Sequence, residues 1–222
     1  HVSQLKKVNS VIVIEDKIMF KKPSIFSKPI AKIQMGVSQM LACPPDRVEV
    51  KLVAQHAFEY YVLNATVPDE LPPYLLKATL DGKDITPIAD KALRQPFPFS
   101  YDLHFNRVSA SSGLVALKAL TQKETSKIHL PGIGALVGGF PVIASGSGVM
   151  IDIASEWSME QAVFVNEESL KWDGISQISK DGTIVFTDKT QRALYELSGK
   201  FIETLSVETA QDQAKDLLYA LS

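Results

Sequence analysis

The apolar positions between residues 27 and 61 predict a helix followed by a strand. Ser27-Lys28-Pro29 suits a helix start, because serine caps free amides and a proline in the first turn needs no donor. Apolar residues then recur at helical spacing, at Ile30, Ile33, Val37, Met40 and Leu41. Pro44-Pro45 ends this helix, and the valine-rich alternation of residues 48–53 predicts a strand. His56 stands just past the end of that strand.

Turn dipeptides divide much of the remaining chain into hairpins. Asp81-Gly82, the Gly146–Gly148 segment and Asp181-Gly182 each lie between apolar runs, which is typical of tight β-turns. The aromatic run at residues 58–63 and the run at residues 11–14 also resemble strands. Strands joined by tight turns and mixed with helices predict an α+β fold with a mostly antiparallel sheet, packed by long helices.

Four further helices follow from the same pattern. Apolar spacing predicts a helix over about 106–120, and Ser158-Met-Glu-Gln161 is a capping box that opens a helix reaching about Trp172. Two helices, at about 189–205 and 207–221, close the chain. We therefore expect a leader strand and loop at 1–28, a main domain at 29–172, and a hairpin with two helices at 173–222.

Composition and charge exclude several classes of function. The chain has 222 residues, 45% hydrophobic and 22% charged, with a net charge of −2 and no basic block, which argues against a nucleic-acid partner. No segment is long and apolar enough to span a bilayer, so no membrane partner is expected. The single Cys43 argues against a disulfide framework or a zinc cluster and favours a cytoplasmic protein without a metal.

The chain begins with His1 rather than Met, and no signal peptide follows. We expect a fragment or a tag remnant, with native sequence missing upstream. The glycines at 132, 134 and 138 suggest a dinucleotide fingerprint at first sight, but such a motif must feed a helix. Because Gly139-Phe-Pro141 stops a helix, a tight bend or the wall of a cleft is the better interpretation.

Histidines and cations supply the candidate site residues. His56 is a candidate catalytic residue, although a lone histidine beside aromatic residues is more often structural. His104, Asn106 and Arg107 form either an anion site or a solvated helix start. His129 is interpreted as packing, and Trp157 and Trp172 as core residues.

One stretch carries a family resemblance. Residues 29–57 resemble the middle of lactate and malate dehydrogenases: Leu41-Ala-Cys-Pro-Pro45 falls on the family's Leu-Gly-Val-x-Pro, and Ala54-Gln-His56-Ala on its Gly-Glu-His-Gly. The hydroxyl-rich start at 109–113, the GGFPVIASGSGVMIDI segment and the helix from Ser158 follow in the family's order. The resemblance covers about 29–172.

The resemblance implies the C-terminal, substrate-binding half of an NAD-dependent oxidoreductase of the 2-hydroxyacid dehydrogenase-like type. His56 would exchange a proton with the substrate, and Lys32, Asn106, Arg107 and Ser109 would bind a small anionic substrate. NAD or NADP would serve the full-length protein, with neither expected on this chain alone, and a homo-oligomer is compatible with the family. The superfamily also contains nicotinamide-dependent glycosidases with a similar second domain.

Departures from the family support a different hypothesis. Pro29 takes the place of the family's acidic partner of the histidine, and Lys32 takes the place of its substrate-binding arginine. Gln55 replaces the glutamate of the family's Gly-Glu-His-Gly motif. The nucleotide-binding half is absent, and residues 174–222 extend past the family's end. The alternative is a non-catalytic binding or assembly domain that kept the fold and lost the reaction.

Overall fold

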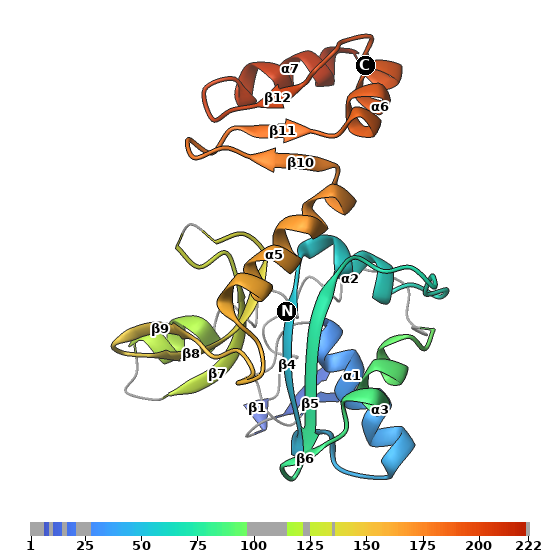
Figure 1. The fold of residues 1–222 in the computed structure, drawn as a ribbon, viewed down its shortest axis with the longest axis vertical. Coiled ribbons are helices and arrows are strands. Elements are labelled where there is room, and N and C mark those ends of the chain that lie inside the picture. The colour runs from blue at the N-terminus through green and yellow to red at the C-terminus, as the bar shows by residue number, and fades with distance from the viewer. Residues whose placement is uncertain are drawn as a thin grey trace. The chain divides into compact units, whose positions relative to one another are not determined.

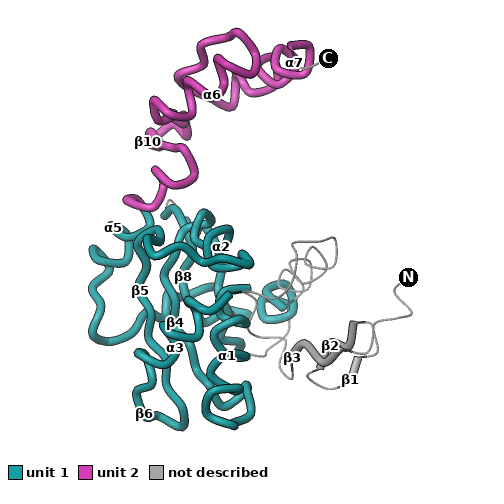
Figure 2. The backbone as a smooth tube through the Cα atoms, turned by 90° about the vertical axis from the view of Figure 1, so that its right-hand side faces the viewer, with its two compact units in different colours: residues 1–166 teal, residues 167–222 magenta. Residues whose placement is uncertain are grey.

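The computed structural model describes residues 28–96, 115–121, 125–134 and 136–220, and the backbone of three strands before them. Those strands are β1 (Lys7–Val8), β2 (Val11–Ile14) and β3 (Lys17–Phe20), which pair antiparallel in this order. The contacts divide the chain into unit 1, His1–Asn166, and unit 2, Glu167–Ser222 (Figure 2). The sequence placed the corresponding boundary six residues later, at 172/173.

An antiparallel sheet organises unit 1. Its strands are β4 (Val48–Ala54), β5 (Tyr74–Leu80), β6 (Lys83–Asp84), β7 (Ser126–Pro131), β8 (Gly139–Ser145) and β9 (Gly148–Ile151). The order is β6-β5-β4-β8-β7, with β9 paired to β8, and every pairing is antiparallel. Figure 1 shows β4 and β5 side by side, with β7, β8 and β9 leading away from them. The predicted α+β class is confirmed.

Helices pack on both faces of this sheet. The bounds are α1 (Lys28–Leu41), η2 (Pro45–Arg47), α2 (His56–Val62), α3 (Thr86–Leu93), a helical stretch at 115–121, and α5 (Met159–Ser169). One core joins α1 and α3 to Leu52, and a second joins Ala119 and Ala162 to Val53 and Phe140. Because successive residues of a strand point to opposite faces, Leu52 and Val53 place these cores on the two sides of β4.

The predicted amphipathic stripe of the first helix is confirmed in its N-terminal part. Ile30, Ile33 and Val37 of α1 are buried in the first core, whereas Met40 and Leu41 are exposed. The helix ends before the two prolines, since Ala42 already adopts a positive φ of 48°. The stripe therefore holds α1 against β4 over its first three turns only.

All three predicted tight turns close hairpins. Asp81 and Gly82, with φ of 50° and 78°, join β5 to β6, as a type I′ turn requires. Gly146 and Ser147 join β8 to β9 through the Ser145↔Gly148 pair. In unit 2, Asp181-Gly182 lies between β10 (Ile175–Ile178) and β11 (Ile184–Phe186). The turn chemistry thus located the antiparallel pairings correctly.

Two sequence-based predictions were wrong. Residues 58–63 form most of α2 and its C-cap rather than a strand, because Phe58, Val62 and Leu63 reach the core together at helical spacing. The helix predicted over 189–205 is α6 (Asp188–Ser198), which stops at Gly199 in the left-handed conformation, and residues 204–205 form strand β12. In both cases the context of neighbouring residues outweighed local propensity.

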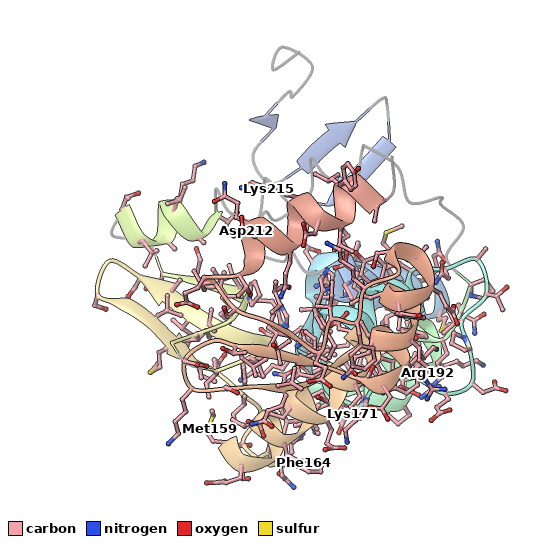
Figure 3. The ribbon with its side chains drawn as sticks, turned by 90° about the horizontal axis from the view of Figure 1, so that it is seen from above. Met159, Phe164, Lys171, Arg192, Asp212 and Lys215 are labelled. Atoms are coloured by element: carbon pink, nitrogen blue, oxygen red, sulfur yellow. The ribbon has the colours of Figure 1, made fainter. Side chains whose placement is uncertain are left out.

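Unit 2 is a small sheet with two helices. Strands β10, β11 and β12 (Thr204–Leu205) pair in order, after η3 (Leu170–Asp173) and beside α6 and α7 (Ala210–Ala220). Asp212 and Lys215 form a surface ion pair one turn apart on α7 (Figure 3). Within the described residues, no helix combines the length and apolar character needed to cross a membrane.

Candidate functional site

Strands β4 and β8 separate at Pro141, almost as soon as they meet. Their register contains one pair, Ala54↔Gly139. The next position on this edge of β8, opposite Leu52, is Pro141, which has no N–H to donate. The Pro141 carbonyl instead accepts a hydrogen bond from the Asp152 amide, 2.8 Å away, just after β9. The same edge of β8 therefore pairs first with β4 and then with β9, and this change of partner leaves a gap beside β4.

This gap contains a cavity of about 200 Å³ between β4, β7 and β8. Its lining includes Val48, Val50, Lys51, Lys127, His129 and Asp152. A water molecule occupies about 30 Å³ in the liquid, so the volume corresponds to roughly seven waters. The cavity thus matches the size of a small metabolite or a short piece of extended chain.

His129 bridges the gap at its closed end. Its imidazole lies against Gly139 on the neighbouring strand, where a Cβ atom would stand 2.8 Å from Nε2. The ring forms a hydrogen bond with the backbone of Leu52, and this bond favours the protonated ring, so the ring donates and the Leu52 carbonyl accepts. The side chain of His129 supplies the donor that Pro141 lacks.

The buried position of this ring controls its charge. Burial lowers the pKa of the His129 imidazole to about 4, while the bond to Leu52 and the charge of Glu59 oppose the shift. Nε2 is shielded from solvent and has no hydrogen-bond partner among the described residues. Since Leu52 holds one nitrogen as the donor, a neutral ring keeps the lone pair on Nε2.

Charged side chains line the open part of the cleft. Lys51 Nζ donates to Asp152 Oδ1 at 2.8 Å and to the Ile153 carbonyl at 3.2 Å, which links β4 to the end of β9. Lys127 is exposed and forms no ion pair with any described residue. Asp46 and Glu49 also line the cavity. The cleft therefore offers one uncommitted cation and two carboxylates beside an apolar wall.

A second buried polar side chain also packs against the backbone of Gly138 and Gly139. Asn166 of α5 is fully buried, and its Nδ2 donates to the Gly139 carbonyl at 3.4 Å. A Cβ on Gly138 would stand 2.7 Å from Cβ of Asn166, and Gly138 has a φ of 81°. Gly138 and Gly139 are thus required where His129 and Asn166 approach the backbone.

The predicted catalytic residue His56 lies outside the residues that line this cavity. It is the first residue of α2, its side chain is exposed, and its ring meets Tyr60 edge-on with centroids 4.9 Å apart. Gln55 caps the helix by accepting from the His56 amide. The position directly after β4 agrees with the predicted spacing, and the catalytic role remains a prediction.

The predicted substrate-binding Lys32 is buried within α1. Its ammonium donates to the carbonyl of Val62, the last residue of α2, at 2.6 Å and to that of Gln95, two residues past the end of α3, at 2.5 Å. Burial lowers the pKa of Lys32 to about 8. Val62 and His56 stand at opposite ends of α2, ~9 Å apart along its axis. Lys32 therefore joins two helix ends, where a cation complements the carbonyls.

The other predicted site residues lie in a part of the chain that the structure does not describe. They are Asn106, Arg107 and Ser109, together with His104. The glycine-rich segment forms the turn between β7 and β8, closed by a bond from the Gly132 amide to the Gly138 carbonyl at 2.8 Å. Within the described ranges, no group of three or more His, Cys, Asp or Glu residues is arranged to hold a metal ion.

The sequence interpretation missed His129 as a site residue, because a histidine near a proline in an apolar strand looks like packing. The available signal was Gly138-Gly139 followed by Pro141, which marks a strand that admits a close neighbour and then loses a ladder hydrogen bond.

Comparison of the chain with family models, curated proteins and solved structures gives no match. The resemblance to lactate and malate dehydrogenases therefore rests on sequence motifs alone.

Proposed function

We propose that unit 1 is a binding domain for a small polar ligand, held in the cleft that β4, β7 and β8 line. The separation of β4 from β8 at Pro141 carries this proposal, because it opens a cleft within the sheet. Preformed concave sites with a few placed polar groups are the usual form of ligand sites. The proposal corresponds to the non-catalytic alternative raised by the sequence.

The lining residues favour a ligand with an anionic group and an apolar part. Lys127 offers an ammonium that no described carboxylate neutralises, and Val48 and Val50 supply an apolar wall. Lys51 is already paired with Asp152, so its charge is largely compensated. A lysine acts as a point charge, which suits a single carboxylate or phosphate without demanding bidentate geometry.

Binding fits this site better than proton transfer does. A general base works best when its pKa lies near the operating pH, and burial holds the pKa of His129 at about 4. The ring is also fixed by Leu52 and shielded from solvent at Nε2. A neutral imidazole in this position supports the wall of the cleft rather than exchanging a proton with a ligand.

The proposal is tested by backbone NMR during titration with small organic acids and phosphates. We expect amide shifts to cluster at Val48–Leu52 and Lys127–His129, and Lys127→Gln to weaken binding at least threefold. Lys83→Gln is the matched control, because Lys83 is an exposed strand lysine outside the cleft. Shifts centred on α2 instead, or an absence of binding by any probe, would overturn the proposal.

A second candidate function is the oxidoreductase implied by the family resemblance. The exposed His56, placed directly after β4 at the start of α2, favours it. It requires a nucleotide-binding half that would hold NAD or NADP, and a small anionic substrate beside His56. Turnover by a longer protein, abolished by His56→Asn, would support this function over binding alone.

A further inference from the structure

We infer that the ligand of the β4 cleft is an extended peptide segment, which adds as a short strand to the free edge of β4. The inference rests on the proposed function of the cleft and names its ligand class. It follows from the direction of the backbone groups of β4, which the hydrogen bonds of its neighbours fix.

The backbone of Val50 points into the gap. In β5, the Ala78 amide donates to Thr86 Oγ1 at 3.1 Å, and the Ala78 carbonyl accepts from the Ile85 amide at 3.0 Å. Ala78 therefore directs its backbone groups toward β6 and α3, away from β4. Because Val50 is the partner of Ala78, this is a non-hydrogen-bonded pair, and the Val50 amide and carbonyl point to the other side.

The flanking residues of the same parity confirm this direction. The Val48 amide donates to the Pro45 carbonyl, and the Val48 carbonyl accepts from buried Gln34 at 2.7 Å. The Leu52 carbonyl accepts from His129, and Ala54 pairs with Gly139. Val50 lies between these satisfied positions, and none of the described side chains hydrogen-bonds to its backbone.

An adjacent donor and acceptor on a strand edge match the backbone of another extended chain. On this side β4 has no strand partner among the described residues from Val48 to Val53. Strand addition satisfies both Val50 groups at once, whereas a rigid ring or a simple anion satisfies at most one of them. The cavity of about 200 Å³ limits the added strand to a short segment.

Charges around the edge complement the ends of a short peptide. Continuing the Ala54↔Gly139 register along both strands places Val50 opposite Ile143 of β8. Because Lys127 of β7 pairs with Ile143, Lys127 is level with Val50. Its ammonium can take the C-terminal carboxylate. Asp46 and Glu49 line the same cavity and can take the amino group. The described cleft therefore carries the groups that a zwitterionic peptide needs.

The test compares three peptides on the unmodified chain by NMR titration. They are trialanine, its C-terminal amide, and trialanine methylated on the backbone nitrogen of its central residue. We expect trialanine to shift the Val50 amide, amidation to weaken binding at least threefold, and backbone methylation to weaken it at least tenfold. Equal binding of the methylated peptide would overturn the inference. If organic acids bind at these residues and peptides do not, the inference fails and the proposed function stands; if no probe binds, both fail.

A matched pair of variants tests the same contact from the protein. Val50→Pro removes an N–H that the β4–β5 ladder does not use, so the fold should persist while trialanine binding falls at least tenfold. Val50→Ile keeps the N–H and should keep the binding. Full binding by a folded Val50→Pro variant would overturn the inference. A dimer in sedimentation that Val50→Pro abolishes would also overturn it and assign the edge to a second copy of the chain.

Discussion

The imidazole of His129 lies against the Cα of Gly139, in space that any side chain at residue 139 would fill. A methyl group there would overlap Cε1 of the ring and stand 2.9 Å from the carbonyl oxygen of Ala54. One obstacle is a side chain on β7 and the other is backbone on β4. The glycine is therefore needed where the three strands approach one another.

Gly139→Ala should lower the free energy of unfolding by about 1–3 kcal/mol, the usual cost of overpacking a well-filled site. Urea denaturation followed by circular dichroism measures the change. In a His129→Ala background the same substitution should cost less, because the ring is gone while the Ala54 carbonyl remains. Identical costs in the two backgrounds would show that the ring and residue 139 are not in contact.

Acid should destabilise unit 1 through His129. Its pKa is lowered from 6.5 to about 4 in the folded chain, so the unfolded state binds a proton first as the pH falls. The contribution is therefore complete above about pH 6.5 and is lost as the pH falls toward 4, by on the order of 2–3 kcal/mol. His129→Gln should flatten the stability profile in this window relative to the unmodified chain. Parallel profiles for the two proteins would contradict the assignment.

Much of the fold could be predicted from the sequence, because its signals are local. Helix α1 follows from the spacing of Ile30, Ile33 and Val37, and the capping box appears as reciprocal bonds between Ser158 and Gln161, at 2.9 and 3.1 Å. Two of the three hairpins follow from an Asp-Gly dipeptide whose glycine, Gly82 or Gly182, adopts a positive φ. These features depend on residues within one turn of each other.

The cleft could not be predicted in the same way, because its parts come from segments far apart in the chain. The Leu52 carbonyl lacks a partner only because Pro141 stands opposite it, and His129 supplies the donor from a third strand. Lys32 likewise interacts with carbonyls 30 and 63 residues away. Residue type alone does not distinguish a lysine that binds a substrate from one that joins helix ends.

Ile33→Ala should cost about 2–5 kcal/mol, the range for emptying a buried aliphatic site. Ile33 is 0% exposed in the core between α1 and β4. Met40 is a matched control on the same helix, because it is 40% exposed and its replacement by alanine should cost under about 1 kcal/mol. Chemical denaturation measures both. Similar costs at the two positions would mean that α1 does not pack on the sheet through this stripe.

Replacement of Lys32 tests whether this lysine has a structural or a substrate-binding role. Lys32→Met leaves the Val62 and Gln95 carbonyls without this donor, and a buried acceptor that loses its partner costs about 1–3 kcal/mol. Ligand binding in the β4 cleft should be unchanged, because Lys32 does not line the cavity. Loss of binding without loss of stability would restore the substrate-binding role predicted from the sequence.

The pH dependence of the destabilisation caused by Lys32→Met supplies an independent check of this structural role. Because the pKa of Lys32 is lowered to about 8 in the fold, the folded lysine becomes neutral at a lower pH than the unfolded one. Its contribution to stability is therefore complete above about pH 10.4 and falls as the pH drops through 8. Lys32→Met should then be more destabilising at pH 10 than at pH 7, by about 1 kcal/mol or more. Lys28→Met, which removes a lysine paired with Glu59 at 2.7 Å on the same helix, is the control for nonspecific effects of alkali. A cost of Lys32→Met that stays constant across this range would show that its ammonium remains in contact with water.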